Sequence, residues 1–177
     1  MRIFIIFLIL IFSNQSLTKA DDIRDFEIEG ISIGDSALKF FTQEQIIKNS
    51  RNDHYTNSKY TPVQNDFFDF FKKYDAVDFN FKTNDSKFII VSLSGVILYD
   101  DKDIEKCYVK MKEIISELDI AFSNLEQTDI GTSVHPSPKN KSKKSTYTYK
   151  YYDFSNGDMI SVTCYDYSKE HGSQDHL

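Results

Sequence analysis

The chain carries one strong turn signal between two stretches that favour β-strands. Residues 146–154 and 159–167 are rich in tyrosine, threonine, valine and isoleucine, and Asn156-Gly157 lies between them. Asn-Gly is a preferred pair in two-residue hairpin turns because both residues tolerate positive φ. The sequence therefore predicts an antiparallel hairpin, which fixes two neighbouring strands of a sheet and limits the folds open to the rest of the chain.

The length of this turn decides which side chains share a face of the hairpin. A two-residue turn pairs Tyr151 with Val162 and Tyr149 with Cys164. We expect one face to lie in the core; it holds Tyr147, Tyr149, Tyr151, Ile160, Val162 and Cys164. We expect the other to meet solvent; it holds Thr148, Lys150, Tyr152, Ser161, Thr163, Tyr165 and Tyr167.

Three tyrosines on the expected outward face are candidate binding residues: Tyr152, Tyr165 and Tyr167. An exposed tyrosine offers a flat apolar ring with a polar tip, which suits contacts to a protein or a glycan. The alternative interpretation is that tyrosine is common here only because it favours strands.

The clearest helical pattern begins after Asp103. Its apolar residues recur at a spacing of three and four, which predicts a long amphipathic helix packed on one face of a sheet. This apolar stripe consists of Ile104, Cys107, Tyr108, Met111, Ile114, Ile115, Leu118, Ala121, Phe122 and Leu125.

Cys107 and Cys164 are the two cysteines of the chain, one on the predicted helix and one on the predicted sheet. Both lie on faces expected to be buried, so a disulfide between helix and sheet is geometrically reasonable. The alternative is two buried thiols, because cysteine is often buried without a partner.

The segment "GISIGDS" contains two glycines and a hydroxyl group before a predicted helix. The apolar alternation slips by one residue at Gly30, which predicts a strand with a bulge there. Asp35 or Ser36 would cap a short helix, and Thr42 with Gln45 has the capping-box spacing. Because the Asp35 charge would repel an anion, we predict a corner of the fold and no phosphate site.

The remaining pattern completes an α+β fold. Residues 77–81 and 88–99 predict a hairpin whose second strand is central, and residues 48–65 and 127–145 predict long polar loops. The order strand, helix, strand, strand, helix, strand, strand indicates a two-layer sandwich with an antiparallel sheet of about five strands. We expect one domain over residues 21–177, with a polar tail from about residue 168.

The first twenty residues have the layout of a signal peptide. Arg2 precedes the apolar run Ile3 to Phe12, and a polar segment leads to Ala20. The apolar run is about half the length that a membrane-spanning helix needs. We therefore expect cleavage after Ala20, no transmembrane segment afterwards, and a periplasmic or secreted protein.

The net charge of the mature chain limits the kinds of partner that it could bind. Cleavage removes Arg2 and Lys19, which leaves 19 basic against 27 acidic residues and a formal charge of −8. A surface of this sign repels polyanions, so we expect no nucleic-acid partner. Lys139, Lys141, Lys143 and Lys144 form one basic loop, which is typical of a solvated segment.

The histidines do not form a recognisable catalytic or metal-binding motif. His171 and His176 lie in the predicted polar tail, and neither His54 nor His135 has the sequence context of a hydrolase motif. We expect no metal and no cofactor. A small secreted hydrolase with its site in the loops 48–65 and 127–145 remains an alternative, with His54 or His135 beside a carboxylate or serine.

Three stretches carry a resemblance: "FEIEGISIGDSALKFF", "SLSGVILYDD" and "NGDMISVTCYDYS". With them the chain resembles a group of uncharacterised small exported proteins of marine alphaproteobacteria. The resemblance implies export from a bacterial cell, and it implies no activity.

These observations favour a binding or accessory protein of the periplasm or cell envelope without catalytic activity. Its partner would be a protein or glycan of the envelope, and its oligomeric state is left open. The alternatives are the small hydrolase described above and a structural envelope protein.

Overall fold

The computed structural model describes residues 22–51, 59–64, 71–100, 103–137, 140–168 and 174–176, and it is α+β. The helices are α1 (Gln43–Asn49) and α2 (Ile104–Ala121), with 3-10 turns at Ile23–Asp25 and Ala37–Lys39. The strands are β1 (Glu27–Ile28), β2 (Ile31–Ser32), β3 (Tyr60–Val63), β4 (Ala76–Lys82), β5 (Ile90–Val96), β6 (Leu98–Asp100), β7 (Glu126–Gln127), β8 (Gly131–Val134), β9 (Thr146–Asp153), β10 (Met159–Asp166) and β11 (Gln174–His176).

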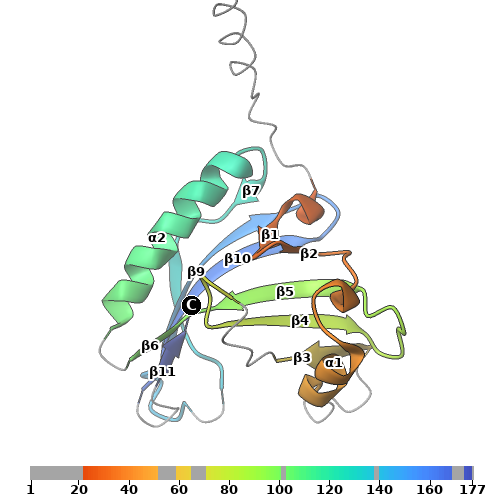
Figure 1. Ribbon diagram of the computed structural model, residues 1–177. Helices are drawn as coiled ribbons and strands as arrows, with labels where there is room; N and C mark the ends of the chain where they lie inside the picture. Colours follow the sequence, from red (N-terminus) through yellow and green to blue (C-terminus); the bar gives the residue numbers. More distant parts are fainter. Residues whose placement is uncertain are drawn as a thin grey trace, which may run out of the picture.

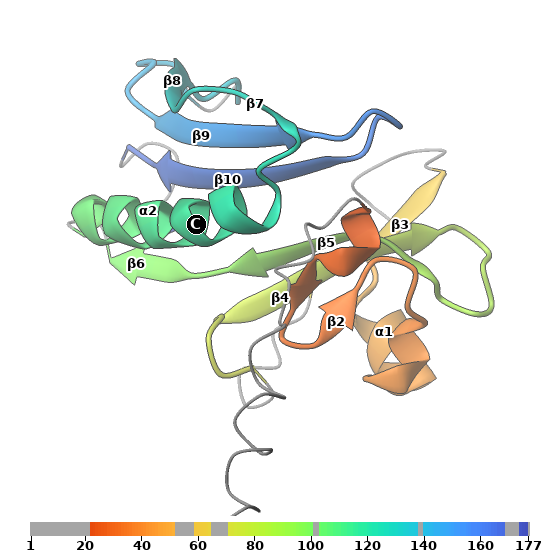
Figure 2. The same cartoon turned by 90° about the horizontal axis from the view of Figure 1, so that it is seen from above.

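In this described part of the chain the strands form three antiparallel sheets instead of one sheet of about five strands. The largest has the order β6-β11-β10-β9-β7, with β8 also paired to β9. A second has the order β3-β4-β5, and β1 and β2 form a small hairpin. β6 continues β5 after Ile97, so the two larger sheets meet at this point (Figure 1 and Figure 2).

The hairpin of β9 and β10 is confirmed, but its predicted register is wrong by one residue. The turn contains three residues, because the Phe154 N–H donates to the Asp158 carbonyl at 2.9 Å. Gly157 has φ +89° and occupies the left-handed position that closes such a turn. A glycine in the third turn position therefore replaces the two-residue Asn-Gly turn that we expected.

A shift of one residue turns every side chain of β9 to the other face. Cys164 pairs with Thr148 and not with Tyr149. The face toward α2 holds Thr148, Lys150, Tyr152, Ile160, Val162 and Cys164. The opposite face holds Tyr147, Tyr149, Tyr151, Ser161, Thr163, Tyr165 and, just beyond β10, Tyr167.

The amino-terminal corner also differs from its prediction. Glu29 and Gly30 both have positive φ, +52° and +79°, and Ile28 pairs with Ile31. These angles define a two-residue hairpin turn, so the slip in the apolar pattern marks a hairpin and not a bulge. Ser36 caps the second 3-10 turn by accepting the Leu38 N–H, as one of the two predicted caps.

The predicted capping box is confirmed. The Thr42 hydroxyl accepts the Gln45 N–H at 3.2 Å, and the Gln45 side chain accepts the Thr42 N–H at 2.8 Å. Each side chain satisfies a backbone donor that the first turn of α1 would otherwise leave without a partner. The helix therefore begins where the sequence indicates.

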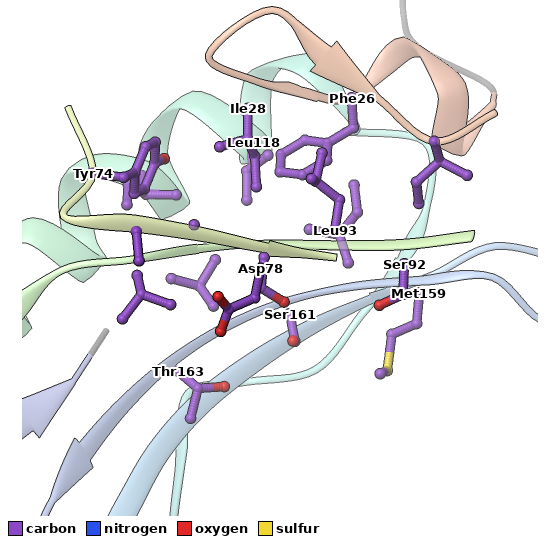
Figure 3. A pocket seen from close by; sticks show the side chains of 18 of the residues that line it. Phe26, Ile28, Tyr74, Asp78, Ser92, Leu93, Leu118, Met159, Ser161 and Thr163 are labelled. Atoms are coloured by element: carbon purple, nitrogen blue, oxygen red, sulfur yellow. The ribbon is translucent and has the colours of Figure 1, made fainter. Parts of the chain in front are cut away.

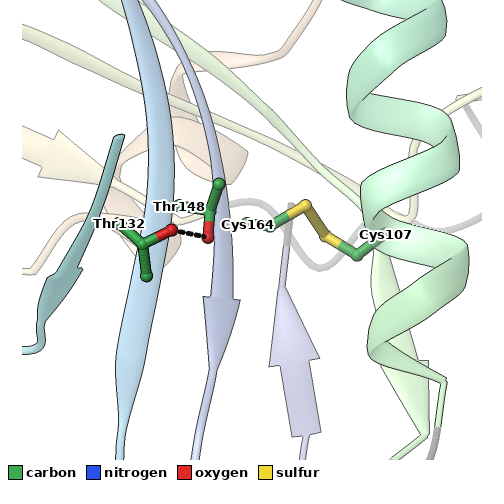
Figure 4. Close-up of a disulfide and its surroundings, with 4 residues drawn as sticks. All are labelled: Cys107, Thr132, Thr148 and Cys164. Carbon is green, nitrogen blue, oxygen red and sulfur yellow. Dashed lines mark hydrogen bonds between the residues drawn. A yellow bond between two sulfur atoms is a disulfide. The ribbon is translucent and has the colours of Figure 1, made fainter. Parts of the chain in front are cut away.

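Helix α2 is tied to β10 by the predicted disulfide. The Cα atoms of Cys107 and Cys164 are 6.0 Å apart, within the usual range for a bridge (Figure 4). Every residue of the predicted apolar stripe belongs to one hydrophobic cluster with the inner side chains of β9 and β10. The side of α2 that packs on the sheet is thus the one that the spacing indicated.

A second hydrophobic cluster lies around β4 and the start of β5. It includes the stacked rings of Phe41 and Phe79, whose centroids are 5.7 Å apart. Phe26 packs against both clusters and therefore joins them at the foot of the β1–β2 hairpin.

Several segments predicted as loops or tail contain strands. β3 lies within the predicted loop 48–65, β7 and β8 lie at or within 127–145, and β11 lies in the predicted tail. All are short, between two and four residues, so they are stabilised by partners distant in sequence. Phe67, Phe70, Phe71 and Tyr74 have the sequence spacing of a helical turn. Of these, Phe67 and Phe70 are outside the described residues, and Phe71 is buried.

Candidate binding cleft

A cleft of about 930 Å³ lies between β5 of one sheet and β10 of the other. The β1–β2 hairpin and α2 close one side of it (Figure 3). Its volume is in the range of ligand-binding sites. Strand residues form most of its walls, so the cleft is a feature of the folded sheets and not of a loop.

The two sides of the cleft differ in chemistry. The side toward α2 is apolar and is formed by Phe26, Ile28, Leu93, Leu118, Ile160 and Val162. The opposite side is mostly polar and is formed by Asp78, Ser92, Ser94, Ser161 and Thr163, with Met159 at one end. In Figure 3, Phe26, Ile28 and Leu118 lie on one side of the β5 ribbon, and Asp78, Ser161 and Thr163 lie on the other. A ligand lying between the strands would meet both surfaces.

Gly95 allows Tyr74 to lie against one face of β5. A Cβ atom at residue 95 would lie 2.6 Å from two ring carbons of Tyr74, closer than van der Waals contact allows. Burial raises the pKa of Tyr74, partly offset by the charge of Lys110. The phenol is therefore neutral at physiological pH.

Five tyrosines form an aromatic surface beside the cleft. We call it the tyrosine face; its members are Tyr147, Tyr149, Tyr151, Tyr165 and Tyr167. Neighbouring rings have centroids 4.9 to 6.2 Å apart, and the rings of Tyr165 and Tyr167 are nearly parallel. Both of these residues also line the cleft, so the tyrosine face and the cleft form one continuous surface.

Burial raises the pKa of Tyr165 and of Tyr151, and neighbouring tyrosines add to both effects. These phenols therefore stay protonated at neutral pH and can donate as well as accept hydrogen bonds. Tyr149 lies against Gly131 of β8, where a Cβ atom would come within 2.9 Å of the ring.

His135 belongs to this ring cluster. Its ring is 5.3 Å from that of Tyr167 and 5.7 Å from that of Tyr165. Its Nδ1 atom accepts the Ser137 backbone N–H at 3.2 Å. The imidazole is thus held in place by its own loop and packs edge-on against the tyrosines.

Tyr152 does not take part in the tyrosine face, contrary to our prediction. Its side chain is fully buried toward α2, and its hydroxyl donates to Asp119 at 2.7 Å. Lys150 also donates to that carboxylate, at 2.6 Å. Burial raises the pKa of Tyr152, and the bond to Asp119 raises it further. The shift in register is the cause, because it turns residue 152 inward.

The cleft was not predicted, although its residues carried a signal. Ser92, Ser94 and Gly95 interrupt the otherwise apolar run at 88–99. The apolar run predicts a central strand covered on both faces, whereas β5 pairs with β4 alone among the described strands. Small polar residues at this edge are the ones that leave room between the sheets.

The other candidates lie elsewhere. His54, His171 and Lys139 are outside the described residues, and Lys141, Lys143 and Lys144 are exposed. Within the described ranges, no group of three or more histidine, cysteine and acidic side chains has the geometry of a metal site. Among the described residues of the two predicted loops, Gln64 is the one that lines the cleft.

Comparisons with known proteins assign no family to this chain. Scans against family models, curated proteins and solved structures found no match to this chain. In the part of the chain that the structure describes, no helix combines the length and apolarity needed to cross a bilayer.

Proposed function

We propose that this chain is an exported binding protein of the bacterial envelope and that it binds its partner in the cleft between β5 and β10. The observation that carries the proposal is the cleft itself, bounded by two strand edges and bordered by the parallel rings of Tyr165 and Tyr167. Tyrosine rings at a concave site are typical of the residues that dominate binding energy.

Export is supported by the disulfide between Cys107 and Cys164, since such bridges persist in oxidising compartments. The leader-like sequence of residues 1–20 and the resemblance to exported proteins agree with this location. The acidic surface favours a neutral or basic partner over a polyanion.

The proposal is tested by presenting the immobilised protein with a displayed library of random peptides and with an array of bacterial glycans. Each retained ligand is measured against the double variant Tyr165→Ser/Tyr167→Ser, with Tyr60→Ser on β3 as the control. We expect the double variant to weaken binding at least about tenfold, the effect of losing aromatic contacts worth roughly 1.4 kcal/mol. Failure to retain any ligand, or equal binding by all variants, would contradict the proposal.

A further inference from the structure

The two strands that border the cleft, β5 and β10, run in the same direction, and β11 lies between β10 and β6, the continuation of β5. β11 is antiparallel to β10, with Tyr165 opposite His176, and antiparallel to β6, with Leu98 opposite His176. Since β6 continues β5, the strands β5 and β10 are parallel to each other and flank one slot. β11 occupies one end of this slot.

The rest of the slot has no strand in it among the described residues. β11 meets β10 at Tyr165, whereas Met159–Thr163 pair with β9 on one side and with no described strand on the other. β5 pairs with β4 on one side; on its second edge Ile90 exchanges backbone hydrogen bonds with Gly34 and Asp35, and Ser92 to Val96 line the cleft. The cleft is therefore the continuation of the space that β11 fills.

The backbone groups of β10 that point into the slot follow from the hydrogen bonds around β9. The Phe154 N–H donates to the Asp158 carbonyl, so the even-numbered residues of β10 bond to β9. The bond from the His135 N–H to the Ser145 carbonyl shows that odd-numbered residues of β9 direct their backbone groups toward β8. The even-numbered residues of β9 therefore bond to β10, in agreement with the turn. Met159, Ser161 and Thr163 consequently direct their N–H and C=O groups into the slot.

The backbone groups of β5 that point into the slot follow from its hydrogen bonds to Asp75. The Val96 carbonyl accepts the Asp75 N–H, and the Leu98 N–H donates to the Asp75 carboxylate. These even-numbered residues thus face β4, and Leu93 and Gly95 direct their backbone groups into the slot. Rows of such groups on both sides are the pattern that pairs with an added strand.

If the register of β11 is continued along the slot, each added residue has one partner on β10 and one on β5. A strand continuing from it would pass between Thr163 and Val96, then Val162 and Gly95, then successive pairs. Directly opposite residues share a face, so the first position meets the polar side of the cleft and the second the apolar side. The pairs that follow are Ser161 with Ser94, Ile160 with Leu93, and Met159 with Ser92.

We propose that the ligand of the cleft is an extended segment of a partner protein, which adds as a strand antiparallel to both β5 and β10. This inference rests on the proposed function. The segment is five residues long within the slot, alternates polar and apolar side chains, and has its amino end beside Thr163. β11 shows that this chain already accepts a strand in the same position and direction.

The test uses a chain extended after Leu177 by Thr-Val-Thr-Val-Thr, which would carry β11 onward into the slot. The control extension is Thr-Pro-Thr-Pro-Thr, because proline lacks the N–H that pairing needs. Amide hydrogen exchange is followed by NMR. We expect the Ser161 and Thr163 amides to exchange at least about tenfold more slowly with the first extension than with the control. Ile160 and Val162, already bonded to β9, should stay unchanged.

Peptide binding to the two extended chains distinguishes strand addition from the proposed function. Peptides retained by the cleft should no longer bind the chain with the Thr-Val extension and should still bind the proline control. Unprotected Ser161 and Thr163 amides would overturn strand addition, even where a cleft ligand has been found, and so would a retained ligand that is a glycan. Protected amides without any retained ligand would overturn the proposed function and leave the slot geometry standing.

Discussion

At the scale of single residues, Asp119 shows how the buried face of the hairpin is held. Its carboxylate accepts from the Tyr152 hydroxyl and from the Lys150 ammonium group. Burial alone would raise the pKa of Asp119, but these two hydrogen bonds and the Lys150 charge hold it below its ordinary value of 3.8. The carboxylate is thus more stable ionised in the folded protein than in the unfolded chain.

The variant Asp119→Asn tests this arrangement through its pH dependence. A lowered folded-state pKa stabilises the protein above the unfolded value of 3.8, and this contribution is lost as pH falls through the folded pKa. We expect the wild-type advantage in unfolding free energy, up to about 1 kcal/mol at a partly exposed site, to shrink below about pH 4. Urea unfolding between pH 3 and 7 measures it. Two results would contradict this role of Asp119. One is a stability difference between wild type and Asp119→Asn that is unchanged at pH 3. The other is an equal difference between wild type and the exposed control variant Asp129→Asn.

Gly95 is the second residue whose identity the structure explains. The variant Gly95→Ala places a methyl group against the Tyr74 ring, and overpacking of this kind costs about 1–3 kcal/mol. We expect a lower midpoint of thermal unfolding and altered ring signals of Tyr74 in NMR spectra. The neighbouring variant Ser94→Ala adds no atoms and serves as the control. Equal stability of the two variants would show that Tyr74 does not pack on Gly95.

At the scale of elements, the disulfide joins α2 to β10 across 57 residues of chain. For a loop of this length the chain-entropy model gives about 4 kcal/mol of stabilisation. We expect the double variant Cys107→Ala/Cys164→Ala to lose roughly that much unfolding free energy, measured in urea. Reduced wild-type protein is the matched control and should unfold like the variant. A variant as stable as the oxidised protein would contradict the role of the bridge.

The sequence predicted those elements whose pattern is local. The stripe on α2, the capping box at Thr42 and the turn at Gly157 each depend on neighbouring residues, and each was located correctly. The register of β9 was missed because two-residue and three-residue turns both accept an Asn-Gly pair, and a difference of one residue reverses the faces.

The binding cleft was harder to predict because it depends on distant pairings. β11 is three residues long and pairs with β6, which lies far away in the sequence, as well as with the nearby β10, so no local pattern reveals it. Tyr165 and Tyr167 were identified as candidate binding residues, whereas Tyr152 was assigned to the wrong face and Ser94 and Gly95 were overlooked.

At the scale of the whole molecule, one hydrophobic cluster lies around β4 and β5 and the other lies between α2 and the β9–β10 hairpin, and Phe26 packs against both. Each sheet has its own buried residues, so the space between the sheets does not have to be filled for either to be stable. This arrangement explains how strand edges can border a cleft in a protein with an extensive core.

Export is tested with the full chain, because the predicted signal peptide is residues 1–20. We expect the protein recovered from the periplasm or medium of a Gram-negative host to begin at Asp21, because signal peptidase would cut after Ala20. Its mass should be lower than that of the reduced form by two hydrogen atoms, reflecting the bridge of Cys107 and Cys164. Recovery of the uncleaved chain in the cytoplasm would contradict export.

The most direct measurement of the open slot is amide hydrogen exchange of the unmodified protein along β10. We expect fast exchange at Ser161 and Thr163, whose N–H groups point into the slot, and slow exchange at Ile160 and Val162, which bond to β9. The alternation is the signature of a strand paired on one side. Slow exchange at all four amides would show that this edge of β10 is already paired, and it would contradict the binding cleft proposed for this fold.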